Sequence, residues 1–527
     1  MEAAKQISNV YDQVLYPSST LPQTHPSRLA TIAYLRGVQP APVDHCRVLE
    51  LGCGTAANLI PMAFQLPESE FIGLDLARRP IAAGQSFVKG LGLSNIILQS
   101  MDLLEARVEQ LGRFDFIIAH GLYSWVPLPV RERILAICQE MLNPQGVAYV
   151  SYNAYPGNHF RDLVRGMMRF HSSVYESPAE KIGQAKGILK LVAHSRAKPD
   201  YYTEAIQAEL NRILKYTDAG FFHDDLGEIN QPFYFHEFMA VAKSYGLQFL
   251  GESGANELNH KELTPEALRT MRELEAADEV VREQFKDFLI ARGFRQTILC
   301  RGELELAPNW RVDRVTGLYT SCDAVRVDRA KSADSSPIVF QRPGGDEIEM
   351  ADPFIAAAFD FLHAQYPCHI GFKEIVEAAR NGAGTRSEKA DGTGDATKLA
   401  QVLLTAHSGG FLGLNFWQPK VVNRVTDRPA TSKLARFQLT GGESATNQLH
   451  VSRRFPDPFA RQLVLLLDGT RDRAMLARDM IEFAKSTEGP VFEKGVQVTD
   501  PDQIPAVVER QLPAALQSLA RDGMLIS

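Results

Sequence analysis

One short stretch, residues 48–58, constrains the fold of the first half of this chain more than any other feature. An apolar run from Val48 to Leu51 ends in the pattern Gly52-x-Gly54, and a helical pattern follows over about residues 56–66. A buried strand that turns through glycines directly into a helix is typical of parallel α/β sheets, whose ligands lie at this turn. The sequence therefore predicts a strand, a tight turn and a helix that form a nucleotide-cofactor site.

Two acids indicate which nucleotide binds there. The next apolar strand, Phe71–Leu74, ends in Asp75, where an acid can accept hydrogen bonds from free ribose hydroxyls. A dinucleotide fingerprint would have a third glycine where this chain has Ala57. Glu50 is unusual beside NAD but suits a cationic ligand, because a carboxylate stabilises positive charge in a partly desolvated site. These features favour S-adenosylmethionine over a dinucleotide.

The segment Glu-Leu-Gly-Cys-Gly-Thr-Ala at residues 50–56 resembles the acid-x-Gly-x-Gly-x-Gly motif of class I methyltransferases, with alanine in the last position. The resemblance implies that S-adenosylmethionine is the cofactor and that Asp102 and the Met101 backbone address its adenine. Residues 1–26 form either a lid or a segment packed on the sheet edge. The predicted cofactor contacts are Tyr11, Glu50, Gly52, Cys53, Gly54, Asp75, Leu76, Met101, Asp102 and His120.

Strands and helices alternate beyond Asp75, which predicts a doubly wound, mostly parallel sheet of the α/β class. Strands are predicted at 95–99, 114–119 and 146–152, and helices at 79–91, 103–111 and 130–142. A helical insert at about 158–231 interrupts the sheet. By resemblance to class I methyltransferases, whose sheet is Rossmann-like, the strands 247–252 and 294–301 close it, with helical stretches at 236–245 and 265–290.

The chain has 527 residues, which predicts about three domains. Residues 1–303 are expected to form the S-adenosylmethionine-binding domain, residues 304–450 a middle domain with a winged-helix-like part, and residues 451–527 a C-terminal winged-helix-like domain. In each of the last two, a helix, a glycine break and an apolar strand follow one another, at 403–414 and at 516–526. Both modules are predicted to be α+β.

Composition excludes several classes of function. The net charge is −7 and 23% of residues are charged, so the basic footprint typical of nucleic-acid binding is missing and the winged-helix-like modules are expected to dock protein or to be structural. The six cysteines form no Cys-x-x-Cys pair, which argues against a disulfide framework. The group His223, Asp225 and Glu228 matches no standard ligand spacing; we interpret it as a solvated loop and helix cap, and no metal is predicted.

Targeting signals are also missing from the sequence. We find no N-terminal signal peptide and no run of 18 apolar residues, the length that a membrane-spanning helix requires. The sequence therefore predicts a cytoplasmic protein that does not insert into a membrane.

The segment 119–127, after the fourth strand, is expected to face the methyl acceptor. The Asn/Asp-Pro-Pro-aromatic motif of methyltransferases that act on base amino groups is missing from it. Tyr123 and Trp125 could instead wall an apolar channel for a lysine, whose amine must lose a proton before attack. Tyr152 and Asn153 could hydrogen-bond that amine. The alternative interpretation is that Tyr123 and Trp125 are packed beneath the insert, and that His120 is a structural residue.

The overall layout is similar to that of bacterial methyltransferases with a methyltransferase regulatory domain, which include the rickettsial protein lysine methyltransferases acting on outer membrane protein B. The segments that carry this resemblance are 11–12, 50–54, 120–127, 151–157, 223–226, 230–234, 292–297 and 467–472. The resemblance implies methyl transfer to protein lysine, with a protein as the partner; a homodimer is left open. Two alternatives remain, a small-molecule N- or O-methyltransferase and a non-catalytic, cofactor-sensing interaction protein.

Overall fold

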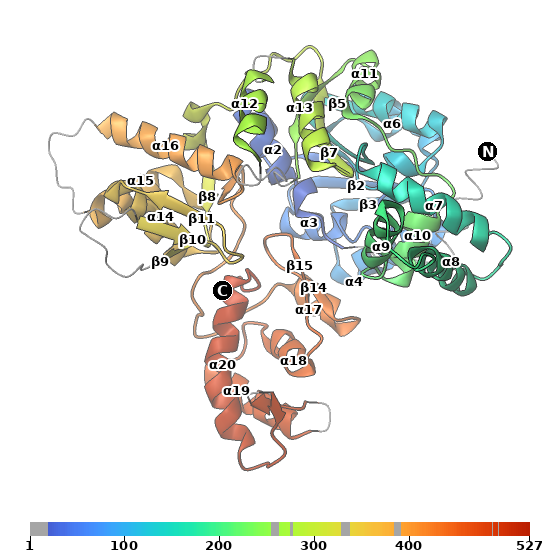
Figure 1. Cartoon of the computed structure of the whole chain (residues 1–527). Helices are drawn as coiled ribbons and strands as arrows, with labels where there is room; N and C mark the ends of the chain where they lie inside the picture. The colour runs from blue at the N-terminus through green and yellow to red at the C-terminus, as the bar shows by residue number, and fades with distance from the viewer. Residues whose placement is uncertain are drawn as a thin grey trace.

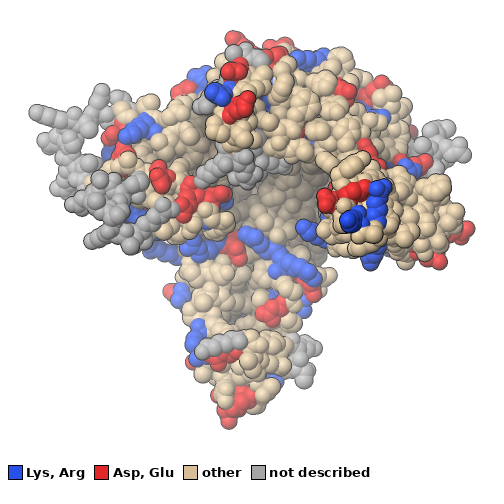
Figure 2. Space-filling model, in the orientation of Figure 1, with Lys and Arg blue, Asp and Glu red and all other residues tan. Residues whose placement is uncertain are grey.

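A computed structural model describes residues 19–254, 263–274, 278–327, 338–383, 392–486, 489–493 and 495–527. Tyr11, a predicted cofactor contact, lies outside these residues. Three lobes meet at the centre of the molecule: the sheet with its insert, a middle lobe beginning after residue 303, and a C-terminal lobe (Figure 1). The surface is hollowed where they meet (Figure 2).

A seven-stranded sheet forms the core of the first lobe, in the order β3-β2-β1-β4-β5-β7-β6. Strands β1 to β5 pair in parallel, whereas β7 runs antiparallel to both of its neighbours. This order confirms the predicted class I methyltransferase sheet. The strands are β1 (Arg47–Leu51), β2 (Glu70–Asp75), β3 (Ile96–Ser100), β4 (Phe114–Ala119), β5 (Leu142–Asn153), β6 (Leu247–Glu252) and β7 (Phe294–Arg301).

Helices cover both faces of the sheet, because its central strands are apolar on both sides. Val48 packs into one core layer, whereas Leu49 and Leu51 pack into the other, as expected for successive residues of a strand. Helices that pack on the Val48 side are α2 (Pro26–Leu35), α3 (Leu59–Gln65) and α4 (Arg78–Leu91), and those on the other side are α6 (Leu128–Met141) and α11 (Phe235–Ser244).

Two predicted helices near the sheet differ from the structure. The helix predicted at 103–111 is a 3-10 turn, η2 (Leu103–Glu105), followed by the short α5 (Val108–Leu111). The extended conformation of Ala106 and Arg107 separates them. The helix predicted from about residue 56 begins at Leu59, because Ala56 has a left-handed backbone with φ of 58°.

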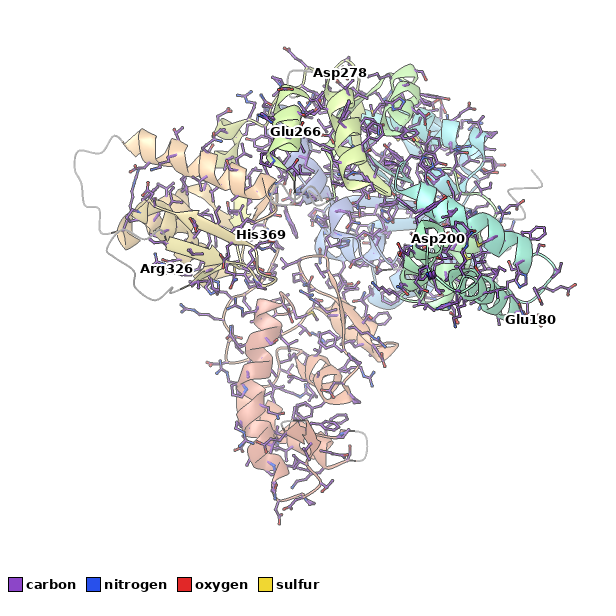
Figure 3. All side chains as sticks on the ribbon, in the orientation of Figure 1. Glu180, Asp200, Glu266, Asp278, Arg326 and His369 are labelled. Atoms are coloured by element: carbon purple, nitrogen blue, oxygen red, sulfur yellow. The ribbon has the colours of Figure 1, made fainter. Side chains whose placement is uncertain are left out.

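The helical insert contains four helices with a small core of their own. Its core includes Val164, Leu189, Ile206 and Phe221. Asp200, labelled in Figure 3, begins the third helix through a capping box with Thr203, a motif that satisfies free N–H groups at a helix start. The third helix ends at Ile213, and the fourth begins at Asp218. The four are α7 (Asn158–Ser172), α8 (Pro178–Ala193), α9 (Tyr201–Ile213) and α10 (Asp218–Leu226).

A buried ionic network joins strand β7 to strand β6 and to the helix that precedes β7 in the chain. Instead of one helix at 265–290, the structure has α12 (Pro265–Glu273) and α13 (Glu279–Ile290). The fully buried guanidinium of Arg295 donates to both carboxylate oxygens of Asp287 at 2.8 and 2.9 Å and to Glu252 at 3.0 Å. Burial alone would lower the pKa of Arg295, but these carboxylates hold it above its usual range.

In its described residues, the middle lobe combines three α-helices with two small sheets, in the orders β11-β10-β9 and β12-β8-β13. The elements are η6 (Val312–Gly317), β8 (Tyr319–Ser321), β9 (Val325–Val327), β10 (Ile338–Gln341), β11 (Glu347–Met350), α14 (Pro353–Gln365), β12 (Ile370–Gly371), α15 (Phe372–Gly382), α16 (Gly392–Ser408) and β13 (Gly413–Asn415).

The C-terminal lobe is helical with two short hairpins. The closing strand predicted at 523–526 is reduced to a single bridge between Leu525 and Thr431. Across the described part of the chain, no helix is both long and apolar enough to span a bilayer. The elements are α17 (Lys433–Thr440), β14 (Ser444–Thr446), β15 (Ser452–Arg454), α18 (Pro458–Leu466), α19 (Arg473–Lys485), β16 (Phe492–Glu493), β17 (Val496–Gln497) and α20 (Ile504–Arg521).

Candidate active site

A cavity of about 680 Å³ lies at the carboxyl ends of β1, β4 and β5 and extends beneath the helical insert. This is the edge of an open α/β sheet where ligands bind. Several predicted site residues line it together. They are Glu50, Gly52, Cys53 and Gly54 from the β1 turn, His120 and Trp125 after β4, and Asn153 at the end of β5.

The β1 turn requires glycine for both conformational and steric reasons. Gly52 has a φ of 72°, and a Cβ atom there would lie 3.1 Å from a methyl carbon of Leu122. Its N–H donates to the carbonyl of Leu74 on β2 at 2.8 Å. Ala56, where the methyltransferase motif has glycine, adopts a left-handed backbone as well, which costs an L-residue about 1–2 kcal/mol. The motif's departure is therefore tolerated without a change of turn.

Glu50 lines the cavity, and one of its two carboxylate oxygens has no hydrogen-bond partner among the described residues. Its side chain is buried, and Oε1 accepts a hydrogen bond from Asn58 Nδ2 at 2.8 Å. Its Oε2 is buried and has no hydrogen-bond partner among the described residues. Burial, with a smaller contribution from Asp75, raises the pKa of this carboxyl to about 7. A buried acceptor that lacks a partner is costly, so the site fits a ligand that brings a cation, as S-adenosylmethionine does.

Asp75 supports the turn through both of its carboxylate oxygens. Oδ2 accepts the N–H of Gly54 and Oδ1 accepts the N–H of Ala77, each at 2.8 Å. Asp102 accepts the N–H of Leu104 and so begins the turn η2. These acids, with Leu76 and Met101, follow β2 and β3 on the same sheet edge as Gly54 but lie outside the described cavity lining. Their contacts with ribose and adenine remain a prediction.

Replacing Asp75 by alanine is expected to weaken S-adenosylmethionine binding by about 1.5–3 kcal/mol, the range for hydrogen bonds to a charged group. The change removes the acceptors that hold the turn at Gly54 as well as the predicted ribose contact. Asp75→Asn keeps one acceptor oxygen and should lose less. Calorimetry of cofactor binding measures both variants, and an affinity of Asp75→Ala equal to that of the original chain would contradict the assignment.

His120 is held as a neutral imidazole beside the cavity. Its Nδ1 lies 2.8 Å from the hydroxyl of Tyr149, and the two rings stack with centroids 5.8 Å apart. Burial lowers the pKa of His120 to about 4. The ring is therefore uncharged at neutral pH, and its orientation is fixed by the β5 side chain.

Tyr123 and Tyr152 do not line the cavity, although Tyr123 was expected to wall the acceptor channel and Tyr152 to hydrogen-bond the amine. The tyrosines are 3% and 1% exposed and belong to the sheet core. The ring of Tyr152 stacks on Phe238 of α11 at 4.1 Å, and its hydroxyl lies 3.1 Å from Thr297 Oγ1. Tyr123 packs against Phe233 and Phe238. These two residues can act on an acceptor only through the packing behind the wall.

Trp125 and Asn153 do reach the cavity. Asn153 Nδ2 donates to Asn230 Oδ1 at 2.6 Å, and the Asn153 N–H donates to Ser124 Oγ at 2.9 Å. The bond to Asn230 orients the side-chain amide of Asn153, whose Oδ1 would then be available to accept a hydrogen bond from a ligand. Trp125 lies between the end of β4 and Gly227, which follows the last insert helix. The cavity lining therefore includes an aromatic ring and a side-chain amide.

Residues of the insert complete the lining, and sequence reasoning missed them. Arg161 and Arg212 both contact Asp225 Oδ1, at 3.0 and 2.7 Å, and Arg212 also binds Glu209. Asp225 is completely buried and His223 nearly so, so the interpretation of these two residues as part of a solvated loop is wrong, whereas Glu228 is exposed. Burial alone would raise the pKa of Asp225, but the two arginines lower it. Three of these side chains, Arg161, Glu209 and Arg212, face the cavity.

Three family models match successive parts of the chain. The model described as "Methyltransferase domain" matches residues 48–146. The model described as "Predicted methyltransferase regulatory domain" matches residues 217–301, from the last insert helix to the end of β7. The model described as "PKMT, C-terminal winged helix domain" matches residues 427–524. The last match supports the winged-helix interpretation of the C-terminal lobe.

Relatives in Rickettsia resemble the whole chain or about half of it. The uncharacterized protein RP789 of Rickettsia prowazekii is 28% identical over 98% of this chain and 94% of its own. The protein RP028 of the same organism is 35% identical over 46% of this chain and 96% of its own. The solved structure of PKMT2 from Rickettsia typhi in complex with AdoHcy superimposes with a TM-score of 0.85 and 28% identity, covering 97% of this chain and 100% of that one.

Proposed function

Because this chain belongs to the class I S-adenosylmethionine-dependent methyltransferases that carry a methyltransferase regulatory domain, we propose that it methylates lysine side chains of a protein. The observation that carries this proposal is the likeness to PKMT2, whose abbreviation stands for protein lysine methyltransferase. The likeness extends along almost the whole chain. When bound, S-adenosylmethionine supplies an electrophilic methyl group. The remaining tasks, binding, orientation and exclusion of water, fall to the residues of the chain.

The β1 turn would hold the cofactor. Glu50 offers its unpartnered oxygen to the positive end of the ligand, and the turn from Gly52 to Gly54 lets backbone approach closely. A carboxylate that gains a cationic partner in a desolvated site stabilises it more than it would in water. Asp75 keeps the turn in place through the N–H of Gly54.

The acceptor would lie between Trp125 and Asn153. A lysine amine is protonated in water, with a pKa of about 10.4, and desolvation lowers that pKa. The indole of Trp125 would supply an apolar wall that excludes water, and the carbonyl oxygen of Asn153 would accept an N–H bond from the amine and so orient its electron pair. Orientation of this kind contributes much of the rate of a direct transfer.

The surface of the insert favours a protein as the substrate. Phe170, Val174 and Tyr201 are 84%, 80% and 86% exposed, and they lie on or beside the helices α7 and α9 that lead down to the cavity. A protein substrate could cover these exposed apolar side chains, since apolar surface of this kind is often buried against a partner. A metabolite acceptor would make no use of them.

A small-molecule N- or O-methyltransferase is the second candidate, and the size of the cavity favours it. A volume of about 680 Å³ is within the range of ordinary small-molecule sites. Both candidates use the same cofactor and the same cavity. They differ in the molecule that carries the transferred methyl group.

Incubation of a cell extract with the enzyme and cofactor carrying a deuterated methyl group is expected to label protein lysines. Trp125→Ala should reduce this labelling by about tenfold or more, because the amine loses its water-excluding wall. Trp125→Phe keeps an aromatic wall and serves as the matched control. Mass spectrometry reads the labelled sites. Label found only in the small-molecule fraction would end the protein proposal.

A further inference from the structure

The turn between β14 and β15 of the C-terminal lobe reaches the back of the cofactor site. His450 in this turn is buried, and its Nε2 lies 2.9 Å from the side-chain oxygen of Asn58. Asn58 in turn donates to Glu50, the acid at the cavity wall. His450 and Asn58 thus connect the C-terminal lobe to Glu50, the carboxylate expected to bind the cation of the cofactor.

The amide of Asn58 is saturated with hydrogen bonds. Its Nδ2 donates to Glu50 Oε1 at 2.8 Å and to Thr24 Oγ1 at 2.9 Å. Its Oδ1 receives the backbone N–H of Leu21 at 2.9 Å and faces the ring of His450. An amide has two donors and two acceptor lone pairs, so each contact fixes the orientation of the others. Loss of any one of them would free the amide to rotate.

The ring of His450 must donate to Asn58. Because the Leu21 N–H identifies Oδ1 as the oxygen of the amide, the nitrogen facing it, Nε2, carries a proton. Burial and the nearby His25 hold the pKa of His450 well below its usual range, so the ring is neutral and Nδ1 has no proton. Nδ1 is buried without a hydrogen-bond partner among the described residues. Among the described residues, the ring of His450 therefore makes one hydrogen bond, to Asn58.

The C-terminal lobe holds this turn rigidly. Asn447 Oδ1 accepts the N–H groups of Leu449 and Val451, and its Nδ2 donates to the carbonyl of Asp522 at the end of α20. From the catalytic side, Gln65 of α3 donates to the carbonyl of Asn447 at 3.0 Å. The left-handed backbone of His450, with φ of 58°, is therefore stabilised from both lobes.

A second contact runs beside the first. The hydroxyl of Ser452, at the start of β15, lies 2.8 Å from the hydroxyl of Thr20 and accepts the Thr20 N–H at 3.2 Å. Thr20 lies between Ser19 and Leu21, which both line the cofactor cavity. The hairpin of β14 and β15 thus positions the segment around Thr20 as well as the side-chain amide of Asn58.

We propose that His450 is a positioning residue of the cofactor site, through which the C-terminal winged-helix lobe sets the affinity for S-adenosylmethionine. His450 orients Asn58, and Asn58 in turn fixes the carboxylate of Glu50 through its bond to Oε1. By thermodynamic linkage, cofactor binding then strengthens the docking of the lobe to the same extent. The inference rests on the cofactor site of the proposed methyltransferase and is independent of which acceptor is methylated.

Two substitutions of equal length test the proposal in the full chain. His450→Gln keeps an N–H donor where Nε2 lies, whereas His450→Met has the same reach without a donor. Both impose the same left-handed backbone on an unbranched side chain. We expect His450→Met to bind S-adenosylmethionine about five- to tenfold more weakly than His450→Gln, which corresponds to one lost buried hydrogen bond. Calorimetry measures both, without any need for turnover.

A comparison of ligands separates positioning from general damage. S-adenosylhomocysteine retains the ammonium group that Glu50 can bind, and 5′-methylthioadenosine lacks both ammonium and sulfonium. The difference in affinity between His450→Gln and His450→Met should persist for S-adenosylhomocysteine, because its ammonium group is the expected partner of Glu50. The difference should vanish for methylthioadenosine. Equal affinities of the two variants for S-adenosylmethionine, or an equal loss for methylthioadenosine, would overturn the proposal. Failure to label lysine in an extract would leave these binding results unchanged.

Discussion

Replacing Arg295 by methionine is expected to destabilise the catalytic domain by about 3–5 kcal/mol, the cost of breaking a buried ion pair by removing one partner. Asp287 and Glu252 would each lose a direct contact of 2.8–3.0 Å. Asp287 is completely buried, and burial already raises its pKa against the pull of Arg295. Part of the loss will appear as protonation of these carboxyl groups. Urea unfolding, with hydrogen exchange at β7 and α13, measures the change.

Two further variants give this prediction its controls. The double change Arg295→Met with Asp287→Leu removes both charges of the central pair and should recover part of the loss, because paired apolar replacements of buried ions cost little. Arg454→Met breaks an exposed pair with Glu443, whose side chains are 74% and 45% exposed, and should change stability by about 0–1 kcal/mol. A loss at Arg295 no larger than that at Arg454 would contradict the importance of the network.

The sequence was sufficient to predict the sheet where local pattern and burial agree. Strand β4, residues 114–119, was predicted with the observed bounds because its apolar run ends at polar residues on both sides. The helix at 103–111 was predicted from periodicity alone and is broken by the extended Ala106 and Arg107. Asp102 favours a tight turn by capping Leu104, and such side-chain bonds compete with helix. Periodicity contains no information about them.

The candidate site also contains residues that local sequence predicts and residues whose position depends on the rest of the fold. Glu50 and the glycines after it could be predicted because the chemistry of the turn is contained in consecutive residues. Tyr152 and Asn153 were treated alike, although neighbouring residues of a strand point to opposite faces. Asn153 reaches the cavity, whereas Tyr152 enters the core beneath α11. The sequence left open which face was which, since both faces of this sheet are covered.

Contacts between distant segments were beyond the reach of sequence reasoning. Arg161 and Arg212 meet at Asp225, and His450 meets Asn58 across 392 positions of the chain. A buried ion pair within an insert and a histidine in a hairpin have no local pattern that distinguishes them from surface residues. The predicted domain boundary at residue 450 falls on His450. The turn that contains His450 contacts Gln65 of the catalytic domain and Asp522 of the C-terminal lobe.

The affinity for S-adenosylmethionine is expected to fall about tenfold between about pH 8 and about pH 6, because Glu50 must be ionised to bind a cation. Burial raises the pKa of its carboxyl to about 7, so the group gains a proton over this interval. Without the cofactor, the contribution of Glu50 to folding stability depends on pH in the opposite direction. A folded pKa above the unfolded value of 4.5 gives a stabilisation that is complete below about pH 4.5 and is lost as the pH rises through about 7.

Glu50→Gln isolates this effect, since the amide keeps the shape of the side chain and cannot ionise. The variant should bind S-adenosylmethionine more weakly at about pH 8 by about 1.5–3 kcal/mol, the value of a hydrogen bond to a charged group. It should also lose the proton release that calorimetry detects on binding in buffers of different ionisation enthalpy. Any titration of the ligand's own amino group remains in the variant and can be subtracted. If the original chain and Glu50→Gln show the same pH dependence, the carboxyl of Glu50 is not the group that meets the cation of the cofactor.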